Sequence, residues 1–230
     1  MPEPIYPAPI SEDAHRHIRT FHARHGRVSQ TRLNAIASVL PTREVTSFAQ
    51  PVVLNRELGG TRSAIDFGCG LGALSRHLLS DPDCAVLSID VHTPGIADIA
   101  SFVAQNPQSR SAFHLGDGID ILEHYLAEES IDDVYVYFPD PWPKPRQHKR
   151  RVIQPYFLDM VHRILKPSGA LLIATDIDSY ADHVRNVAKS RSDFEFTEND
   201  FEALKTSYHE RALRLGHTIH TFTMRKINHS

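Results

Sequence analysis

The chain has 230 residues, 41% of them hydrophobic, and a net charge of −3 at pH 7. This length is enough for one domain with a sizeable core. The charge balance excludes a protein that coats nucleic acid with a uniformly basic surface, so a nucleic-acid partner would have to meet local basic patches.

The two cysteines and fifteen histidines give no pattern of a structural metal site or a disulfide framework. Neither a CxxC pair nor an HExxH helix is present, so we expect no metal and a reducing compartment. No stretch approaches the ~20 apolar residues of a membrane span. The first ten residues lack the basic start and apolar run of a signal peptide. We therefore expect a cytoplasmic protein without a membrane partner.

Residues 1–50 are predicted to form a basic N-terminal arm. They contain a proline-rich tip, the run HRHIRTFHARHGR from His15 to Arg27, and a short helical pattern from Leu33 to Leu40. A charge run by itself is most simply a solvated face, although it can also meet phosphates. Residues 51–230 are predicted to form one catalytic domain.

From about Ser63, short apolar runs alternate with amphipathic stretches, which is typical of a parallel sheet with crossover helices. Apolar spacing predicts helices near residues 71–79, 96–103, 119–126, 156–165 and 179–188. We expect a doubly wound, mostly parallel, seven-stranded α/β sheet whose last two strands form a hairpin at one edge. The predicted strands are 64–67, 85–89, 112–115, 134–138, 170–174, 194–196 and 218–224.

The segment IDFGCGLGA predicts a ligand loop between the first strand and the first helix. Its glycines, Gly68, Gly70 and Gly72, would let the backbone turn tightly and let a nucleotide-like ligand approach closely. The same spacing fits an oxidoreductase with a nicotinamide cofactor. Asp66, just before the glycines, favours a cationic group such as the amino group of S-adenosylmethionine over a pyrophosphate. Asp90, at the end of the second strand, would hold a ribose diol in either case.

Asp117 follows the third predicted strand in the segment LGDGID. Two interpretations of this acid remain open: it contacts an adenine amino group, or it is the N-cap of the next helix.

The segment FPDPWPK, residues 138–144, is the most informative part of the sequence. The ring of proline fixes its own φ angle and biases the residue before it toward extended geometry. Phe138, Asp140 and Trp142, each of which precedes a proline, therefore have few allowed backbone conformations. We predict that Asp140 is held rigidly at the mouth of a site, and the alternative is a stiff turn that ends the strand. Trp142 either stacks on an unstacked base or anchors packing. The cations from Lys144 to Arg151 either meet phosphates or begin a solvated helix.

With these residues in place, the chain resembles the bacterial tRNA (guanine-N7)-methyltransferase family over most of its length. The matching motifs are IDFGCGLG, SIDVHTPG, FPDPWPK followed by HKRR, ATD, RTFHARHGRVS near the N-terminus, and T-x-Y followed by RLGH. The resemblance implies a class I, Rossmann-like methyltransferase with S-adenosyl-L-methionine as cofactor and tRNA as partner. It implies cofactor contacts at Asp66, Asp90, Asp117 and Asp140, and RNA contacts at Lys144, Asp176 and Thr206.

Two departures from the family pattern are present. Asp66 and Asp90 stand where the family usually has Glu, which keeps the charge and shortens the reach. In the Thr-x-Phe-Glu element, the chain reads TSYH, so His209 occupies the place of the acid and Glu210 follows it. Both His209 and Glu210 are candidate substrate-binding residues. A changed substrate, a small purine-like or heteroaromatic compound methylated by the same fold, is the second hypothesis.

Methylation of guanine N7 needs no base, because N7 already carries a lone pair. Positioning should dominate catalysis. We predict that Asp140 is the catalytic group, since a carboxylate at this place would orient guanine and favour the positive charge that develops on the purine. The resemblance implies the variable-loop guanine as target. A non-catalytic RNA-binding relative would have no need of four separately placed acids, and the sequence leaves monomer and homodimer open.

Overall fold

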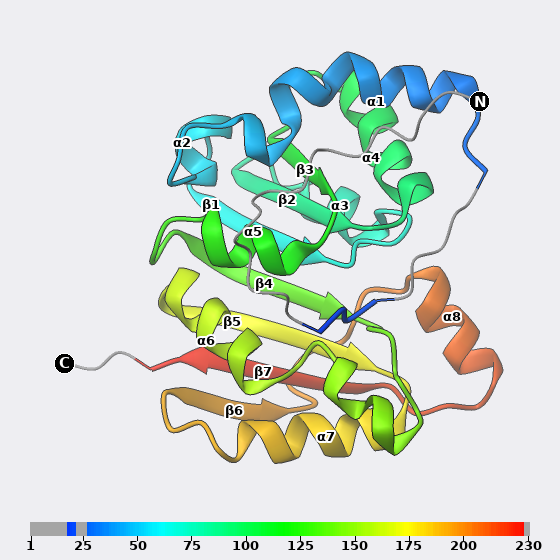
Figure 1. The fold of residues 1–230 in the computed structure, drawn as a ribbon, viewed down its shortest axis with the longest axis vertical. Helices are drawn as coiled ribbons and strands as arrows, with labels where there is room; N and C mark the ends of the chain where they lie inside the picture. Colours follow the sequence, from blue (N-terminus) through cyan, green and yellow to red (C-terminus); the bar gives the residue numbers. More distant parts are fainter. Residues whose placement is uncertain (1–17, 22–26, 228–230) are drawn as a thin grey trace.

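The computed structural model describes residues 18–21 and 27–227. The proline-rich tip and most of the first basic run lie outside the described residues. Figure 1 shows the described chain as a single sheet with helices packed along it.

Over the described residues, the sheet has seven strands in the order β3-β2-β1-β4-β5-β7-β6. Strands β1 to β5 pair in parallel, and β7 runs antiparallel to both β5 and β6. The predicted fold class, including the hairpin at one edge, is confirmed. The strands are β1 (Arg62–Phe67), β2 (Cys84–Asp90), β3 (Ser111–Leu115), β4 (Ile131–Tyr137), β5 (Leu165–Thr175), β6 (Phe194–Glu198) and β7 (His220–Lys226).

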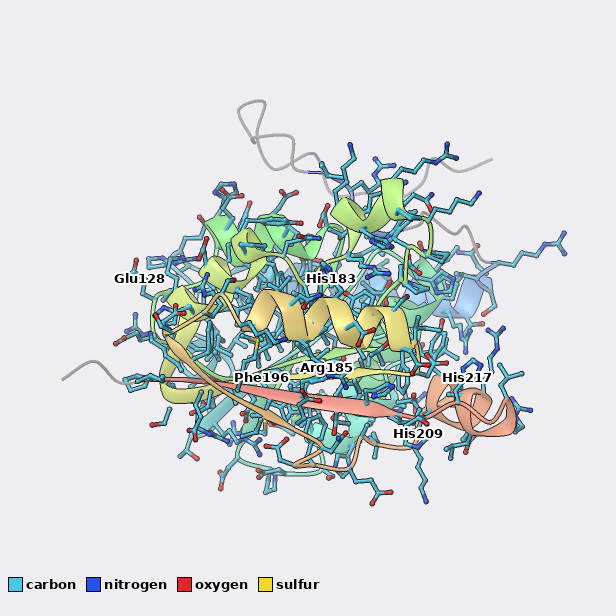
Figure 2. All side chains as sticks on the ribbon, turned by 90° about the horizontal axis from the view of Figure 1, so that it is seen from below. Glu128, His183, Arg185, Phe196, His209 and His217 are labelled. Atoms are coloured by element: carbon cyan, nitrogen blue, oxygen red, sulfur yellow. The ribbon has the colours of Figure 1, made fainter. Side chains whose placement is uncertain are left out.

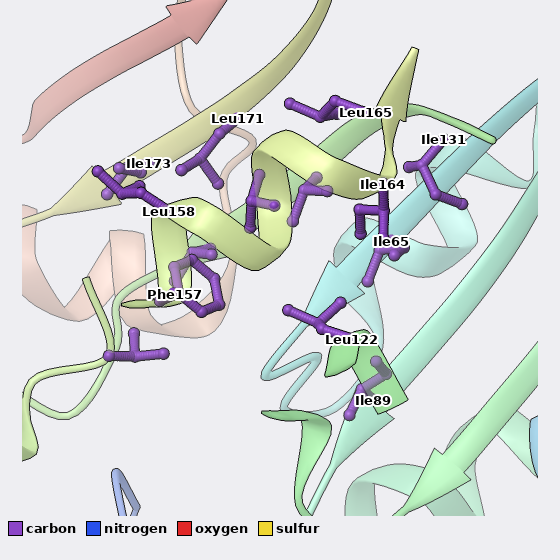
Figure 3. Close-up of a cluster of buried hydrophobic side chains, with 14 of the residues drawn as sticks. Ile65, Ile89, Leu122, Ile131, Phe157, Leu158, Ile164, Leu165, Leu171 and Ile173 are labelled. Atoms are coloured by element: carbon purple, nitrogen blue, oxygen red, sulfur yellow. The ribbon is translucent and has the colours of Figure 1, made fainter. Parts of the chain in front are cut away.

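Helices cover both faces of the sheet, and the alternation of side chains along β1 shows how. Ile65 belongs to the large apolar cluster formed with α5 and α6 (Figure 3), whereas its neighbour Ala64 packs with Leu74 and Leu78 of α3. The helices are α1 (Gln30–Arg43), α2 (Leu54–Leu58), α3 (Ala73–Leu78), α4 (Thr93–Gln105), α5 (Gly118–His124), α6 (Pro155–Ile164), α7 (Asp178–Ala188) and α8 (Ser207–Arg214), with 3-10 turns η1 (Val45–Ser47) and η2 (Pro145–Arg150).

The helix of the predicted arm is longer than expected and packs on the sheet domain. Ile36 and Val39 of α1 share an apolar cluster with Ile96 and Val103 of α4. Just after α1, Glu44 lies 2.7 Å from the Nδ1 atom of a buried histidine on β3. Division of the chain near residue 50 stays a prediction, and α1 belongs to the folded body.

Two short helices were not predicted. α2 has five residues, and α8 buries only two of its eight, His209 and Ala212. α2 is too short for a repeating apolar pattern, and the large apolar side chains of α8, Tyr208 and Leu213, are exposed. In Figure 1, α8 lies at the end of the molecule toward which the β4 and β5 arrows point.

Candidate active site

A pocket of about 240 Å³ lies beyond the carboxyl ends of β1 to β4. Strand β1 has β2 on one side and β4 on the other, so the chain order reverses here. Ligands of open α/β sheets bind in the crevice at such a switch point. The loops that line this pocket carry most of the acids singled out in the sequence.

The glycine loop after β1 forms one wall of the pocket. Gly68 and Gly70 have φ angles of 81° and 53°, which L side chains rarely adopt. A Cβ atom on Gly68 would meet no atom within 4 Å, so its backbone faces open space. Gly72 does not line the pocket and instead lets α4 come close, because a Cβ there would lie 2.3 Å from Ile99.

The start of α4 packs against the side of this loop that faces away from the pocket. A Cβ atom on Gly95 would lie 1.8 Å from the carbonyl oxygen of Gly70. Glycine at position 95 therefore allows the helix and the loop to touch.

Asp66 lies at the inner end of the pocket and is 2% exposed. Ser75 donates a hydrogen bond of 2.6 Å to its carboxylate, and Ser88 donates in turn to Ser75. Burial raises the pKa of Asp66 to about 6, with a smaller contribution from the charge of Asp90. A cationic ligand group would relieve this cost and hold the carboxylate in its charged form.

Asp90 ends β2 with both carboxylate oxygens bound to the backbone. The N–H of Gly70 donates to one oxygen and the N–H of His92 to the other, each at 2.8 Å. Burial raises the pKa of Asp90, and these hydrogen bonds oppose the rise. The acid is fixed at the rim by the same loop that forms the wall.

Asp117 lines the pocket and also begins a helix. Its carboxylate accepts from the N–H of Ile119 at 3.1 Å, which makes it the N-cap of α5. The helix-cap interpretation is confirmed, and the residue still faces the ligand space.

The FPDPWPK loop follows β4, and Phe138 and Asp140 line the pocket. Extended geometry before the prolines was wrong for Phe138 and Trp142, which have φ angles of 51° and 43°. Such left-handed backbone costs about 1–3 kcal/mol for a bulky residue and persists only when the surroundings fix it. Phe138 is fixed by its N–H bond to Ala174 on β5 (2.8 Å) and by ring stacking on Tyr208 of α8.

Trp142 is a packing anchor. Its side chain is 1% exposed, and its Nε1 donates to the carbonyl oxygen of Thr20 at 2.9 Å. The alternative, a tryptophan available to stack on a base, does not fit this burial.

The basic run after this loop divides into two groups. Arg151 is 1% exposed and donates to the carbonyl oxygens of Pro141 and Ser179, and Arg150 lies 3.6 Å from the centre of the Trp142 ring. Both arginines hold the loop. The burial of Arg151 does not fit a phosphate contact, whereas such a contact stays a prediction for the partly exposed Arg150. The remaining cations of the run, Lys144, Arg146 and Lys149, are exposed.

The substrate-side candidates are only partly brought together. Thr206 lines the pocket and caps α8 by accepting from the N–H of His209, and Tyr208 lines the pocket as well. Lys144 and Asp176 do not line it. Asp176 instead accepts from Nδ1 of His217 at 2.8 Å.

His209 is 5% exposed and lines a different cavity, together with Phe201 and His217. It lies at the α8 end of the molecule (Figure 2), with its ring edge-on to Phe138 at 6.2 Å. Glu210 is exposed and lines neither cavity. The roles of all these residues in binding stay predictions.

The lining residues that sequence reasoning did not assign to the pocket include Thr20, Phe21 and Tyr208. The segment RTFHARHGR stands out in the sequence by its charge, which gives no sign that part of it covers a pocket. Among the described residues, no group of three or more His, Cys, Asp or Glu side chains could hold a metal ion, and no helix is long and apolar enough to cross a membrane.

The strand order with its antiparallel β7, the glycine loop after β1 and the acids near the ends of β1 and β2 define a methyltransferase of the class I type. Two solved structures share the fold at low sequence identity. An rRNA methylase from Streptococcus thermophilus has a TM-score of 0.52 and 17% identity, with 76% of this chain and 93% of that chain covered. An S-adenosylmethionine-dependent O-methyltransferase from Thermotoga maritima has a TM-score of 0.51 and 16% identity, with 90% and 69% covered.

The sequence comparisons identify the family. Residues 61–222 match the family described as putative methyltransferase. A tRNA (guanine-N(7)-)-methyltransferase from Nitrosomonas europaea is 34% identical, covering 90% of this chain and 95% of the relative. One from Streptomyces avermitilis is 32% identical, covering 95% and 79%. The chain belongs to the tRNA (guanine-N7)-methyltransferase family, which decides the open cofactor question against a nicotinamide oxidoreductase.

Proposed function

We propose that the protein transfers a methyl group from S-adenosylmethionine to N7 of a guanine in tRNA, and that this guanine lies in the variable loop. The observation that carries the proposal is the meeting of Asp66, Asp90, Asp117 and Asp140 around one pocket in a chain of this family. Their arrangement supports a binding site for a cationic nucleoside at one end and a reaction at the other.

The residues present fit S-adenosylmethionine. Asp66 offers a buried carboxylate of raised pKa, which matches a cationic amino group. Asp90 has both carboxylate oxygens fixed at the rim, where ribose hydroxyls would donate to them. Open space over the Gly68 backbone leaves room for close approach of the ligand. When bound, the sulfonium supplies the electrophilic methyl group.

The chain itself supplies orientation and electrostatics at the reacting end. Phe138 and Tyr208 bring aromatic rings from two different elements to the pocket wall, and such rings bind flat purines well. Asp140, two residues after Phe138 in the same loop, lines the pocket as well and would accept hydrogen bonds from the guanine edge. Its charge would favour the positive charge that the purine gains as N7 is methylated. No proton has to leave N7, so holding the reactants in line provides most of the rate.

The exposed cations Lys144, Arg146 and Lys149 follow the Asp140 loop directly. They support tRNA as the partner, because phosphates beside a target base at the pocket would meet them. The reaction is proposed to occur in the cytoplasm.

The test is incubation of the full chain with labelled S-adenosylmethionine and unmodified tRNA, followed by nucleoside analysis. N7-methylguanosine is the expected product, and it should disappear when the variable-loop guanine is replaced by adenine in a transcript. Label in another nucleoside would contradict the chemistry. Label that enters small purines but not tRNA would instead support the second hypothesis.

A further inference from the structure

The short segment Arg19–Phe21, named here the roof segment, lies against the pocket although it is far from it in sequence. Thr20 and Phe21 line the pocket together with Asp66 and Asp140. Thr20 is 8% exposed, and the side chain of Arg19 lies over the ring of Phe21 at 5.4 Å. The segment is therefore packed in place.

The roof segment is held through its backbone. Trp142 Nε1 donates to the carbonyl oxygen of Thr20 at 2.9 Å. Arg150 donates from Nε to the carbonyl oxygen of Arg19 at 3.0 Å and from Nη2 to that of Phe21 at 3.5 Å. Three consecutive carbonyl groups are thus bound by two side chains, and these contacts fix the path of the chain across the pocket.

Trp142 and Arg150, named here the clasp, also stabilise each other. The guanidinium carbon of Arg150 lies 3.6 Å from the centre of the Trp142 ring, which is the geometry of a cation–π contact. Because the guanidinium is planar, it can stack on the indole and still direct two N–H groups at carbonyl oxygens. The ammonium of lysine is not planar, so it cannot stack on the indole in this way while it donates to both carbonyl oxygens.

The clasp joins the roof segment to the loop that carries Asp140. Trp142 is two residues from Asp140 and has a φ angle of 43°, a backbone conformation that bulky residues adopt only under constraint. The bond to Thr20 and the stacking of Arg150 provide part of that constraint. One set of contacts therefore shapes both the cover of the pocket and the backbone beside the proposed catalytic acid.

We propose that the roof segment is part of the cofactor site, and that Trp142 and Arg150 are positioning residues that keep it closed over S-adenosylmethionine. The inference rests on the proposed use of this cofactor. It gives the basic arm a second role, since its residues Thr20 and Phe21, which line the pocket, would cover the bound cofactor. Release of bound cofactor then requires the roof segment to separate from the clasp.

The first variant to test is Trp142→Phe, which removes the N–H donor and keeps an aromatic ring under Arg150. Binding of S-adenosylmethionine is measured on the full chain without tRNA by calorimetry, and its dissociation by chasing bound tritiated cofactor with unlabelled cofactor. Loss of one hydrogen bond to a carbonyl predicts a cofactor Kd raised about fivefold. The rise is expected to come from faster dissociation of the cofactor. Unchanged Kd and dissociation rate in a folded variant would overturn the proposal.

Arg150→Lys and Lys149→Gln form a matched pair. Arg150→Lys keeps the charge for any phosphate but loses the stacking and one of the two bonds, so the cofactor Kd is expected to rise about tenfold. Lys149→Gln removes an exposed neighbouring charge and should leave the cofactor Kd unchanged while raising the KM for tRNA. If Arg150→Lys also left the cofactor Kd unchanged, Arg150 would not be a clasp residue.

Phe21→Ala provides a variant outside the hydrophobic core, in case changes at Trp142 prevent folding. It should speed cofactor dissociation at an unchanged thermal midpoint, and an unchanged rate would overturn the proposal. A native chain that binds S-adenosylmethionine but methylates another substrate would refute the proposed function alone. A native chain that does not bind this cofactor would refute both.

Discussion

The two sides of the pocket differ in how firmly they are built. On the cofactor side, the glycine loop, Asp66 and Asp90 are fixed by hydrogen bonds to serine hydroxyls and backbone N–H groups. On the side of α8, two of eight helix residues are buried, while Tyr208 and Leu213 are 48% and 53% exposed. The difference indicates that the cofactor half is preformed, and we expect the substrate to complete the α8 half.

Asp140→Asn is expected to give the largest effect, because Asp140 lies where the two sides meet. Methyl transfer should fall by about 10²-fold or more, the size of effect expected when one preorganised electrostatic contact is lost. The Kd of S-adenosylmethionine should stay within about twofold of the native value. Single-turnover kinetics with tritiated cofactor measure the first quantity and calorimetry the second. Near-normal turnover would remove Asp140 from the mechanism.

Asp66 allows a pH test of the preformed side. Its pKa in the free protein is raised to about 6, so the ligand-free acid is protonated below that pH. If it binds a cation as carboxylate, cofactor affinity should fall about tenfold per pH unit below pH 6 and level off above pH 7. Calorimetry between pH 5 and 7 checks this, and Asp66→Asn should flatten the profile. A flat native profile would contradict the assigned role.

The same raised pKa has the opposite sign for stability. An acid whose pKa is higher in the folded state favours folding at low pH, and this contribution is lost as pH rises from about 4 through 6. Asp66→Asn is therefore expected to unfold at a higher temperature than the native chain at pH 7, although it binds cofactor less tightly. Thermal scans at pH 7 and pH 5 measure the gain and its decrease. Equal midpoints at pH 7 would show that burial of this charge costs little.

Replacing the exposed cations Lys144, Arg146 and Lys149 together by Gln tests the side completed by RNA. Each lost phosphate contact should lower the slope of log K against log salt by about 0.7–0.9. Affinity for tRNA is expected to fall about tenfold at moderate salt while the cofactor Kd is unchanged. Filter binding across a salt series measures the affinity for tRNA and the slope, and calorimetry measures the cofactor Kd. An unaltered slope would place the RNA elsewhere.

His209→Glu is expected to give the smallest change in activity, and it tests whether position 209 of α8 contacts the substrate. Since His209 is 5% exposed and does not line the cofactor pocket, restoring the acid of the family pattern would bury a carboxylate. We expect a loss of about 1–3 kcal/mol in stability and no gain in methyl transfer. Thermal unfolding and tRNA assays measure the two effects. A gain in activity would show that this position reaches the substrate.

The strands and most helices could be predicted because each buries a repeating apolar pattern. Local chemistry also predicted the glycine turn and the acids at the carboxyl ends of β1, β2 and β3. The α8 helix could not be predicted in this way, since its stability depends on the Thr206 cap and on contacts such as the ring stacking of Tyr208 on Phe138.

The roof segment and the clasp lay beyond sequence reasoning for a different reason. Thr20 and Trp142 are 122 residues apart. Any residue can accept a hydrogen bond at its backbone carbonyl, so the residue type at position 20 does not indicate this contact. Arg151 resembles a phosphate ligand in the sequence, because exposed and buried arginines look alike there. The left-handed backbone of Trp142 similarly depends on tertiary contacts that oppose the local preference.

Gly95 shows that the shape of the pocket is set from outside it. It does not line the pocket, yet a single methyl group at this position would overlap the Gly70 carbonyl oxygen. Gly70 in turn holds Asp90 through its N–H group. Replacing one hydrogen atom of Gly95 by a methyl group, on a helix that does not line the pocket, would thus displace the loop and with it the carboxylate of Asp90. Which substitutions the site tolerates therefore depends on the residues packed behind the loop as much as on those that line the pocket.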